Sequence, residues 1–307
     1  FVFNNLSLTR PQTRTSLPLQ AVLVSIVMHS LWGGNPVAVK FGLLVFPPMW
    51  SAFVRFAIGI ICIAAWAAFR GIPMWPKKGE WRLLILLAAL FVIQMGTLNI
   101  GFDLTKGSIA AILISTNPLF AAFAAHFIIV DDRLSFRKAV GLMIAFGGVA
   151  IVLLGGFSLE SLNPIGWGGV VVLLSSSLLG LRLVFMAKVQ QEISGVRVVL
   201  WQMILSLPLF AFAGAAFETI RWENLAFAPI AGLLYQGVVI AGLGFMVIAY
   251  LLSRYPPSLI ASFNFVSPIS GVLLSAIFLG DQITPAIVGG VICVGVGLYF
   301  VSRPKTV

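Results

Sequence analysis

A few polar side chains lie inside long apolar stretches of this sequence, where an idle polar group would be costly. In residues 20–44, the 3.6-residue period places Ser25, His29 and Trp32 on one helical face beside Gly33. His29 is either a satisfied interior group or a functional group that lines a cavity or couples transport to protons. Trp32 is either a packing residue or a platform for a solute ring. The combined face indicates a binding surface more strongly than either residue alone.

Comparable polar positions recur along the chain and suit hydrogen bonding to a small uncharged or zwitterionic molecule. Ser115 and Asn117 precede Pro118, which interrupts a helical stretch and can free backbone carbonyls for a ligand. Small residues there are equally consistent with close helix packing. The candidate solute-binding residues are His29, Trp32, Gln94, Ser115, Asn117, Ser176, Tyr235, Gln236 and Asn264.

Arg55 and Arg182 are the permanent charges that fall well inside apolar stretches. We expect a structural or gating role for both, and also for the helix-interrupting Pro118 and Pro268. Arg55 either reaches the membrane interface or binds the carbonyls of a kinked helix. For Arg182 the alternative is contact with a solute carboxylate.

The other reactive residue types exclude several kinds of chemistry. All nine acidic residues fall in predicted loops or at the ends of apolar stretches, which argues against paired carboxylates for hydrolysis and against a buried carboxylate proton relay. Cys62 and Cys293 lie in apolar runs, where a thiol is usually a small hydrophobic group. We therefore expect no enzyme activity, no metal site and no cofactor. A proton, if one is carried, would use His29.

Composition places these residues in a membrane. The chain has 307 residues, of which 60% are hydrophobic and 9% charged, far below the charged fraction of soluble domains. Its mean hydropathy is +1.08. The apolar stretches predict an all-α polytopic membrane protein with ten transmembrane helices, at residues 20–44, 49–69, 82–102, 107–130, 136–155, 164–188, 196–217, 228–252, 257–279 and 284–302.

Charge on the connections predicts the orientation. Of the 19 Lys and Arg residues, fourteen lie on the side that holds both termini, and Lys40, Lys106 and Arg221 lie on the other. Both termini are therefore expected in the cytoplasm. The net charge of +10 is spread over short loops beside the membrane, which argues against nucleic acid as a partner. The expected partners are the lipid bilayer and a small-molecule solute, and the expected state is a monomer, with a homodimer as the alternative.

Two segments of the sequence repeat the same order of features. Pro118 is followed by Asp132-Arg133-Leu134 and a glycine-rich stretch, and Pro268 is followed by Asp281-Gln282-Ile283 and another glycine-rich stretch. Each half holds five spans, and because five is odd the second copy enters the membrane from the opposite side. Inverted repeats of this kind are typical of transporters. The glycine pairs at i and i+7 predict close-packed helix seams.

Four features resemble the EamA repeat of the drug/metabolite transporter superfamily. They are the Trp32-Gly33-Gly34-Asn35-Pro36 break, Arg55, the stretch from Asn117-Pro118 to Asp132-Arg133-Leu134, and the glycine-rich fifth span. Within the superfamily the general likeness is to YddG-type exporters of aromatic amino acids. The resemblance implies efflux of small metabolites across a bacterial inner membrane, with the site between the halves. It predicts a cytoplasmic tail at 1–19, a first repeat at 20–155, a connecting loop at 156–163, a second repeat at 164–302 and a second cytoplasmic tail at 303–307.

The leading hypothesis is export of amino acids, aromatic or otherwise neutral, by alternating access through a central cavity. A cavity lined by amides and hydroxyls suits zwitterions and aromatic solutes, whereas highly phosphorylated solutes need more buried cations. Other drugs and metabolites, such as cationic toxins or nucleosides, are the alternative solutes. From another class, an intramembrane lipid-modifying enzyme would depend on Asp131 or Asp132. A scaffold without transport would tolerate substitution of His29, Gln94 and Asn264.

Overall fold

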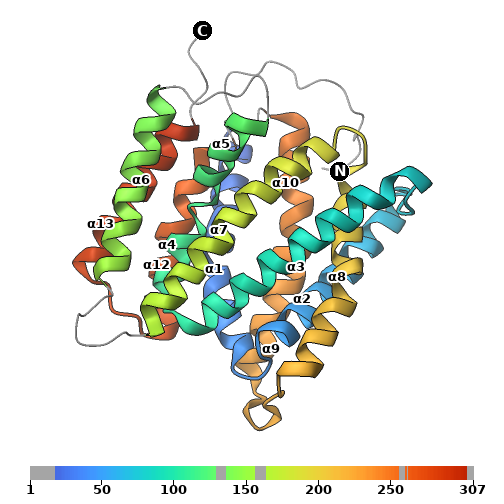
Figure 1. The fold of residues 1–307 in the computed structure, drawn as a ribbon, viewed down its shortest axis with the longest axis horizontal. Coiled ribbons are helices and arrows are strands. Elements are labelled where there is room, and N and C mark those ends of the chain that lie inside the picture. Colours follow the sequence, from blue (N-terminus) through green and yellow to red (C-terminus); the bar gives the residue numbers. More distant parts are fainter. Residues whose placement is uncertain (1–17, 129–135, 156–163, 256–259, 261, 303–307) are drawn as a thin grey trace.

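The computed structural model describes residues 18–128, 136–155, 164–255, 260 and 262–302, and the regular structure in these residues is helical (Figure 1). The elements in chain order are α1 (Leu19–Leu43), α2 (Pro48–Phe69), η1 (Lys78–Glu80), α3 (Trp81–Leu104), α4 (Gly107–Ile114), α5 (Asn117–Ile128), α6 (Phe136–Gly155), α7 (Pro164–Val189), α8 (Gly195–Phe217), η2 (Trp222–Asn224), α9 (Phe227–Leu234), the π-helix η3 (Tyr235–Gly244), α10 (Phe245–Arg254), η4 (Ser262–Phe265), α12 (Val266–Leu279) and α13 (Pro285–Ser302).

These elements make ten membrane spans in the described part of the chain. Seven helical segments are long and apolar enough to cross a bilayer, and two shorter apolar segments, Phe263–Leu279 and Pro285–Phe300, follow them. The 20-residue α6 supplies the remaining span. The predicted all-helical fold with ten spans is therefore confirmed.

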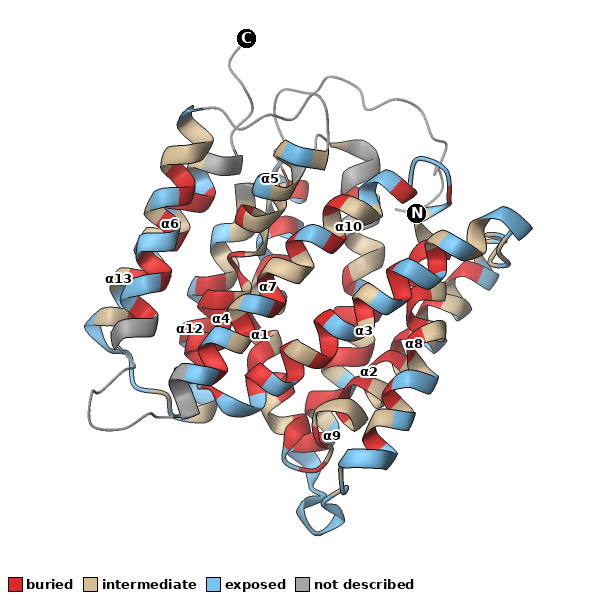
Figure 2. Cartoon of the chain, viewed as in Figure 1, coloured by how far each residue is buried: buried red, intermediate tan, exposed pale blue. Residues whose placement is uncertain are grey.

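The outside of the bundle is unlike that of a soluble protein, because it exposes many large apolar side chains while several polar ones are buried. Large apolar residues such as Val27, Ile61 and Met143 are more than half exposed, whereas Gln94 and Gln236 are fully buried. Figure 2 shows exposed and buried surfaces alternating along the long helices. An apolar exterior around polar interior groups is what a lipid environment stabilises, because the bilayer core offers no hydrogen bonds to an outward-facing amide.

The span predicted at 107–130 is not one continuous helix. It breaks between α4 and α5, where the carbonyl oxygen of Ile114 accepts hydrogen bonds from Asn117 Nδ2 (2.8 Å) and Ser176 Oγ (3.3 Å). The hydroxyl of Thr116 donates to the carbonyl of Leu113 (2.6 Å). The break before Pro118 thus frees carbonyls, but the protein's own side chains occupy them.

Two later spans are also interrupted. A 3₁₀ turn, η4, precedes α12, so the backbone is again irregular just before a proline, Pro268. The span predicted at 228–252 is π-helical in its middle, over Tyr235–Gly244, a geometry that is rare and frequent at functional sites. Pro36 and Pro208, by contrast, lie inside the continuous helices α1 and α8.

The packing partners of the helices relate the two halves by a pseudo-twofold exchange. Helix α1 packs on α12 as α7 packs on α5, and α1 packs on α9 and η3 as α7 packs on α3. The pairs α2 with α8, α4 with α12 and α6 with α13 each join equivalent spans of the two halves. Exchanging the halves maps this pattern onto itself, as two inverted five-helix repeats require.

Gly33 and Gly180 show the pseudo-twofold relation of the two halves in their individual atomic contacts. A Cβ atom added to Gly33 on α1 would collide with the carbonyl oxygen of Ser267, the residue before Pro268. A Cβ atom added to Gly180 on α7 would lie 2.8 Å from the carbonyl oxygen of Asn117, the residue before Pro118. Each half therefore packs a glycine of its first span against the interrupted span of the other half.

The glycine-rich spans α6 and α13 form the close-packed seam that their sequence predicts. A Cβ atom on Gly148 would lie 2.6 Å from Cys293 Cβ, and one on Gly297 would lie 2.5 Å from the carbonyl oxygen of Gly141. Small residues let the two backbones approach, so dispersion contacts hold the pair together where lipid gives no hydrophobic driving force.

Candidate solute-binding site

His29 and Asn264 meet across the boundary between the two halves. His29 lies on α1 and is 2% exposed, and its Nε2 lies 2.8 Å from Oδ1 of Asn264 in η4. Its Nδ1 lies 2.7 Å from the carbonyl oxygen of Ser25. A doubly protonated ring donates both bonds as they stand, and a neutral ring requires the Asn264 amide turned so that its NH₂ donates. The contact therefore survives either protonation state of His29.

Two aromatic rings lie beside the His29 imidazole. The Trp32 ring stands edge-on to His29 at a centroid distance of 5.5 Å, and the Phe263 ring lies 6.5 Å away. The hydroxyl of Tyr235, the first residue of η3, donates to the carbonyl of Leu31 at 2.7 Å. The structure thus brings four predicted site residues, His29, Trp32, Tyr235 and Asn264, to the middle of α1.

A second polar cluster joins α3, α7 and the break between α4 and α5. The Gln94 side chain donates to Ser175 Oγ at 3.1 Å, and Ser175 Oγ donates to the Gln94 carbonyl at 2.8 Å. Ser176 Oγ lies 3.0 Å from Thr116 Oγ1. All four residues are buried. Gln94 and Ser176 therefore share one region, which is related to the His29 region by the exchange of halves.

Two predicted site residues bond to their own chain neighbours. Ser115 Oγ donates to the carbonyl of Ala111 at 2.6 Å, one turn earlier in its helix. Asn117 Nδ2 is occupied by the carbonyl of Ile114. These contacts stabilise the interruption before Pro118, because side chains replace the missing helical hydrogen bonds.

The two interior arginines are buried rather than extended to the interface. Arg55 is 4% exposed, and its guanidinium lies 3.5 Å from Gln236 Oε1 and 3.1 Å from the sulfur of Met95. Gln236 in turn donates to the carbonyl of Ala38 at 2.9 Å. Arg182 is 3% exposed and donates to Gln202 Oε1 at 3.0 Å.

Sequence reasoning did not select several residues that complete these contacts. Phe91 and Met95 on α3 contact the guanidinium groups of Arg182 and Arg55, and Phe263 lies beside His29. An apolar residue in an apolar span carries no signal of such a contact. Gln202, the partner of Arg182, is different, because a polar residue in an apolar stretch is itself a signal of an interior contact.

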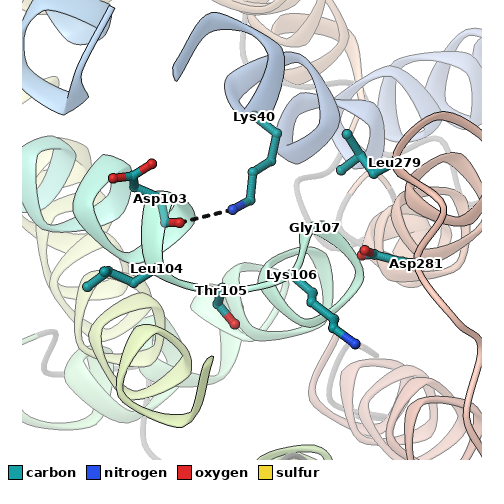
Figure 3. Close-up of a pocket in the computed structure, with 8 residues that line it drawn as sticks. All are labelled: Lys40, Asp103, Leu104, Thr105, Lys106, Gly107, Leu279 and Asp281. Carbon is teal, nitrogen blue, oxygen red and sulfur yellow. Dashed lines mark hydrogen bonds between the residues drawn. The ribbon is translucent and has the colours of Figure 1, made fainter. Parts of the chain in front are cut away.

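A cavity of about 360 Å³ opens at the end of the bundle where α1, α3, α4 and α12 meet (Figure 3). Lys40, Asp103 and Asp281 are among the residues that line it, and Lys40 Nζ donates to the carbonyl of Asp103 at 3.1 Å. Asp281 Oδ2 accepts from the backbone N–H of Ser108 at 2.8 Å. The second half thus caps α4 of the first half at this mouth.

Metal binding has no support in the part of the chain that the structure describes. Its residues form no group of three or more His, Cys, Asp and Glu side chains that could hold an ion. The buried polar groups at the boundary between the halves are mainly amides and hydroxyls, together with the imidazole of His29 and the guanidiniums of Arg55 and Arg182. The chemistry that such groups offer to a small molecule is hydrogen bonding and charge, not metal coordination.

Two exchange-related halves whose buried polar groups meet at their boundary define a membrane transporter of the inverted-repeat class. The chain belongs to the EamA-like transporter family, whose profile matches residues 19–154 and 166–303. It is therefore a membrane transporter of the drug/metabolite transporter superfamily and not an enzyme.

Two relatives and one solved structure are similar over nearly the whole chain. "Uncharacterized transporter YvbV" of Bacillus subtilis (strain 168) is 26% identical over 299 residues, covering 95% of this chain and 92% of its own. "Uncharacterized inner membrane transporter YedA" of Escherichia coli (strain K12) is 26% identical over 312 residues, with 95% of each chain covered. A crystal structure of a chain 16% identical has a TM-score of 0.69 over 92% of this chain and 96% of that one, which shows a shared fold.

Proposed function

We propose that this transporter exports amino acids, aromatic or otherwise neutral, across a bacterial inner membrane by alternating access. Both termini lie in the cytoplasm in this proposal, because most Lys and Arg residues fall on their side. The name of the relative YedA, an inner membrane transporter, supports the choice of membrane.

The observation that carries the proposal is the His29–Asn264 contact at 2.8 Å between the two halves. An imidazole and an amide, flanked by Trp32 and Phe263, offer hydrogen bonds and ring faces to a small amphipathic molecule. The proposed solute-binding residues include those around Gln94 and Ser176, since the exchange of halves places an equivalent polar region there. Rocking of the halves would expose either region to one side in turn.

Cationic solutes receive less support from the structure. Arg55 and Arg182 are buried, and among the described residues the hydrogen-bond acceptors of both are uncharged. A permanent cation entering this interior would meet two like charges at low dielectric, which costs free energy. A zwitterion or an anion avoids that cost.

The direct test is flux of labelled amino acids into liposomes that contain the purified protein, with empty liposomes as the control. Uptake of neutral or aromatic amino acids above the control is the expected result. A complete panel of amino acids with no flux in either direction would overturn the proposed solute class.

The same liposomes test whether His29 couples transport to protons. If it does, an imposed pH gradient drives accumulation in the wild type and loses its effect in His29→Leu. Gradient-driven accumulation that persists in His29→Leu would show that another group carries the proton. Flux that ignores the gradient in the wild type would indicate facilitated diffusion.

A further inference from the structure

Arg55 and Arg182 lie inside the bundle, and the described residues supply neither of them with the counter-ion that a buried charge normally has. In the described part of the chain, Arg55 bonds to two neutral acceptors, Gln236 and Met95, and Arg182 bonds to one, Gln202. The Gln236 bond is 3.5 Å long, near the limit for a hydrogen bond. The described carboxylates lie at helix ends or in loops, so none of them neutralises this interior.

The two arginines come from opposite halves, and each guanidinium lies over one ring of the same pair of contacting phenylalanines. The guanidinium carbon of Arg55 on α2 lies 4.5 Å from the centre of the Phe56 ring, and that of Arg182 on α7 lies 4.9 Å from the Phe91 ring. The Phe56 and Phe91 rings are 4.6 Å apart. Because both guanidiniums are positively charged and lie on the two rings of this pair, they repel each other. Cation–π contacts stabilise each guanidinium but leave the charge unneutralised.

The unpaired polar atoms around this ring pair are mostly donors. Nε of Arg55, Nε of Arg182 and Nε2 of Gln202 are buried without a hydrogen-bond partner in the described structure. Two further buried atoms without a partner in the described residues are Oε1 of Gln94, one helical turn from Phe91, and the hydroxyl oxygen of Ser51, one helical turn from Arg55. A ligand that satisfied these groups would therefore present acceptors and negative charge, with at most one donor group.

We propose that Arg55 and Arg182 bind the carboxylate of the transported solute between the two halves. A carboxylate offers two oxygens to the planar donor fork of a guanidinium and supplies the missing charge. The Oε1 atom of Gln94 is the acceptor for an ammonium group on the same solute. This proposal rests on the proposed function, the transport of a small solute, and adds the carboxylate as the group by which the solute is recognised. It applies to any carboxylic acid and not to amino acids alone.

The test on the solute needs the wild-type protein alone. The purified full chain is titrated with phenylalanine, phenylalanine amide, phenylpropionate and phenethylamine, and binding is read from the thermal shift. The amide and the amine lack the carboxylate, so they should bind at least about 10-fold more weakly than phenylalanine, the loss expected when charge-assisted hydrogen bonds disappear. Equal binding of phenylalanine and its amide would overturn the proposal.

The test on the protein uses Arg182→Gln, which removes the charge, and Arg182→Lys, which keeps it without the planar fork. Arg182→Gln should abolish the preference for carboxylates, and Arg182→Lys should retain part of it. The matched control is Arg197→Gln, because Arg197 is also buried but is paired with Glu80 at 2.5 Å. The control should keep the carboxylate preference. Loss of the preference in Arg197→Gln as well would show that the effect is structural.

The outcomes separate this proposal from the choice of amino acids as solutes. Arginine-dependent binding of phenylpropionate without any amino acid binding or flux would end the amino-acid proposal and support the carboxylate site. Amino acid flux together with equal binding of phenylalanine and its amide would support the amino-acid proposal and overturn the carboxylate site. No carboxylate-dependent shift with any of the four compounds would overturn the carboxylate site.

Discussion

Nε2 of His29 lies 2.8 Å from Oδ1 of Asn264, and this contact joins the first span of one half to the interrupted ninth span of the other. Its two residues are 235 positions apart in the sequence. A hydrogen bond between the halves holds them in one arrangement. Opening that boundary to a solute must break the bond or replace it with bonds to the solute.

The first prediction concerns the coupling between these two residues. His29→Leu and Asn264→Leu should each lower the free energy of unfolding by about 1–3 kcal/mol, because each leaves a polar partner unpaired. The double variant should lose less than the sum of the two, by roughly 0.5–1.5 kcal/mol. Unfolding in mixed detergent micelles measures all three. Strictly additive losses would show that the contact contributes nothing in the membrane protein.

The second prediction uses two neighbouring glycines of α6. Gly148→Ala should lower stability by about 1–3 kcal/mol, since the new Cβ would lie 2.6 Å from Cys293 Cβ and force α6 away from α13. Gly147→Ala is the control, because nothing lies within 4 Å of a Cβ atom there. Thermal unfolding in detergent compares the two variants. Equal stabilities would contradict the close-packed seam.

The third prediction follows from the pseudo-twofold relation of Gly33 and Gly180. A Cβ atom on either would meet the carbonyl oxygen before a helix-interrupting proline of the other half. Gly33→Ala and Gly180→Ala should therefore both reduce solute flux in liposomes by a similar factor. Gly295→Ala, whose nearest neighbour would be 4.0 Å away, should leave flux unchanged. A strong effect at one glycine and none at the other would weaken the functional equivalence of the halves.

The fourth prediction concerns the charged mouth. Asp281 accepts the N–H of Ser108 at the start of α4, where an acidic group also interacts favourably with the helix dipole. Asp281→Ala should cost about 0.5–2 kcal/mol of stability, as the loss of a helix cap does. Glu223→Ala, at an exposed position in η2, is the control for removing an acidic charge. Unfolding in mixed micelles distinguishes them, and an equal cost in both variants would rule out a specific cap.

Much of the fold could be predicted from the sequence because lipid imposes a simple rule on it. A span needs about 20 apolar residues, so the predicted end of the 49–69 stretch coincides with the end of α2 at Phe69. Hydropathy carries no information about the backbone geometry within a span. Pro118 did indicate the interruption between α4 and α5, whereas the π-helix from Tyr235 to Gly244 carries no such residue and was not predicted.

The candidate site was predictable only in part for the same reason. A polar residue in an apolar stretch can be recognised from the sequence alone, as His29, Gln94 and Asn264 were. The partner of such a residue cannot be recognised from the sequence when it is a backbone carbonyl, such as that of Ser25, or an aromatic ring, such as that of Phe91. Their roles depend on which helices face each other, and that is decided by tertiary packing.

Alternating exposure of Asn264 tests the central claim, that a site between two inverted halves faces each side in turn. The variant Asn264→Cys is made with Cys62 and Cys293 replaced by alanine, and an impermeant thiol reagent is applied to right-side-out and to inside-out membrane vesicles. The account predicts labelling from both sides and slower labelling when the transported solute is present. Labelling from one side alone, whatever the solute or gradient, would contradict alternating access.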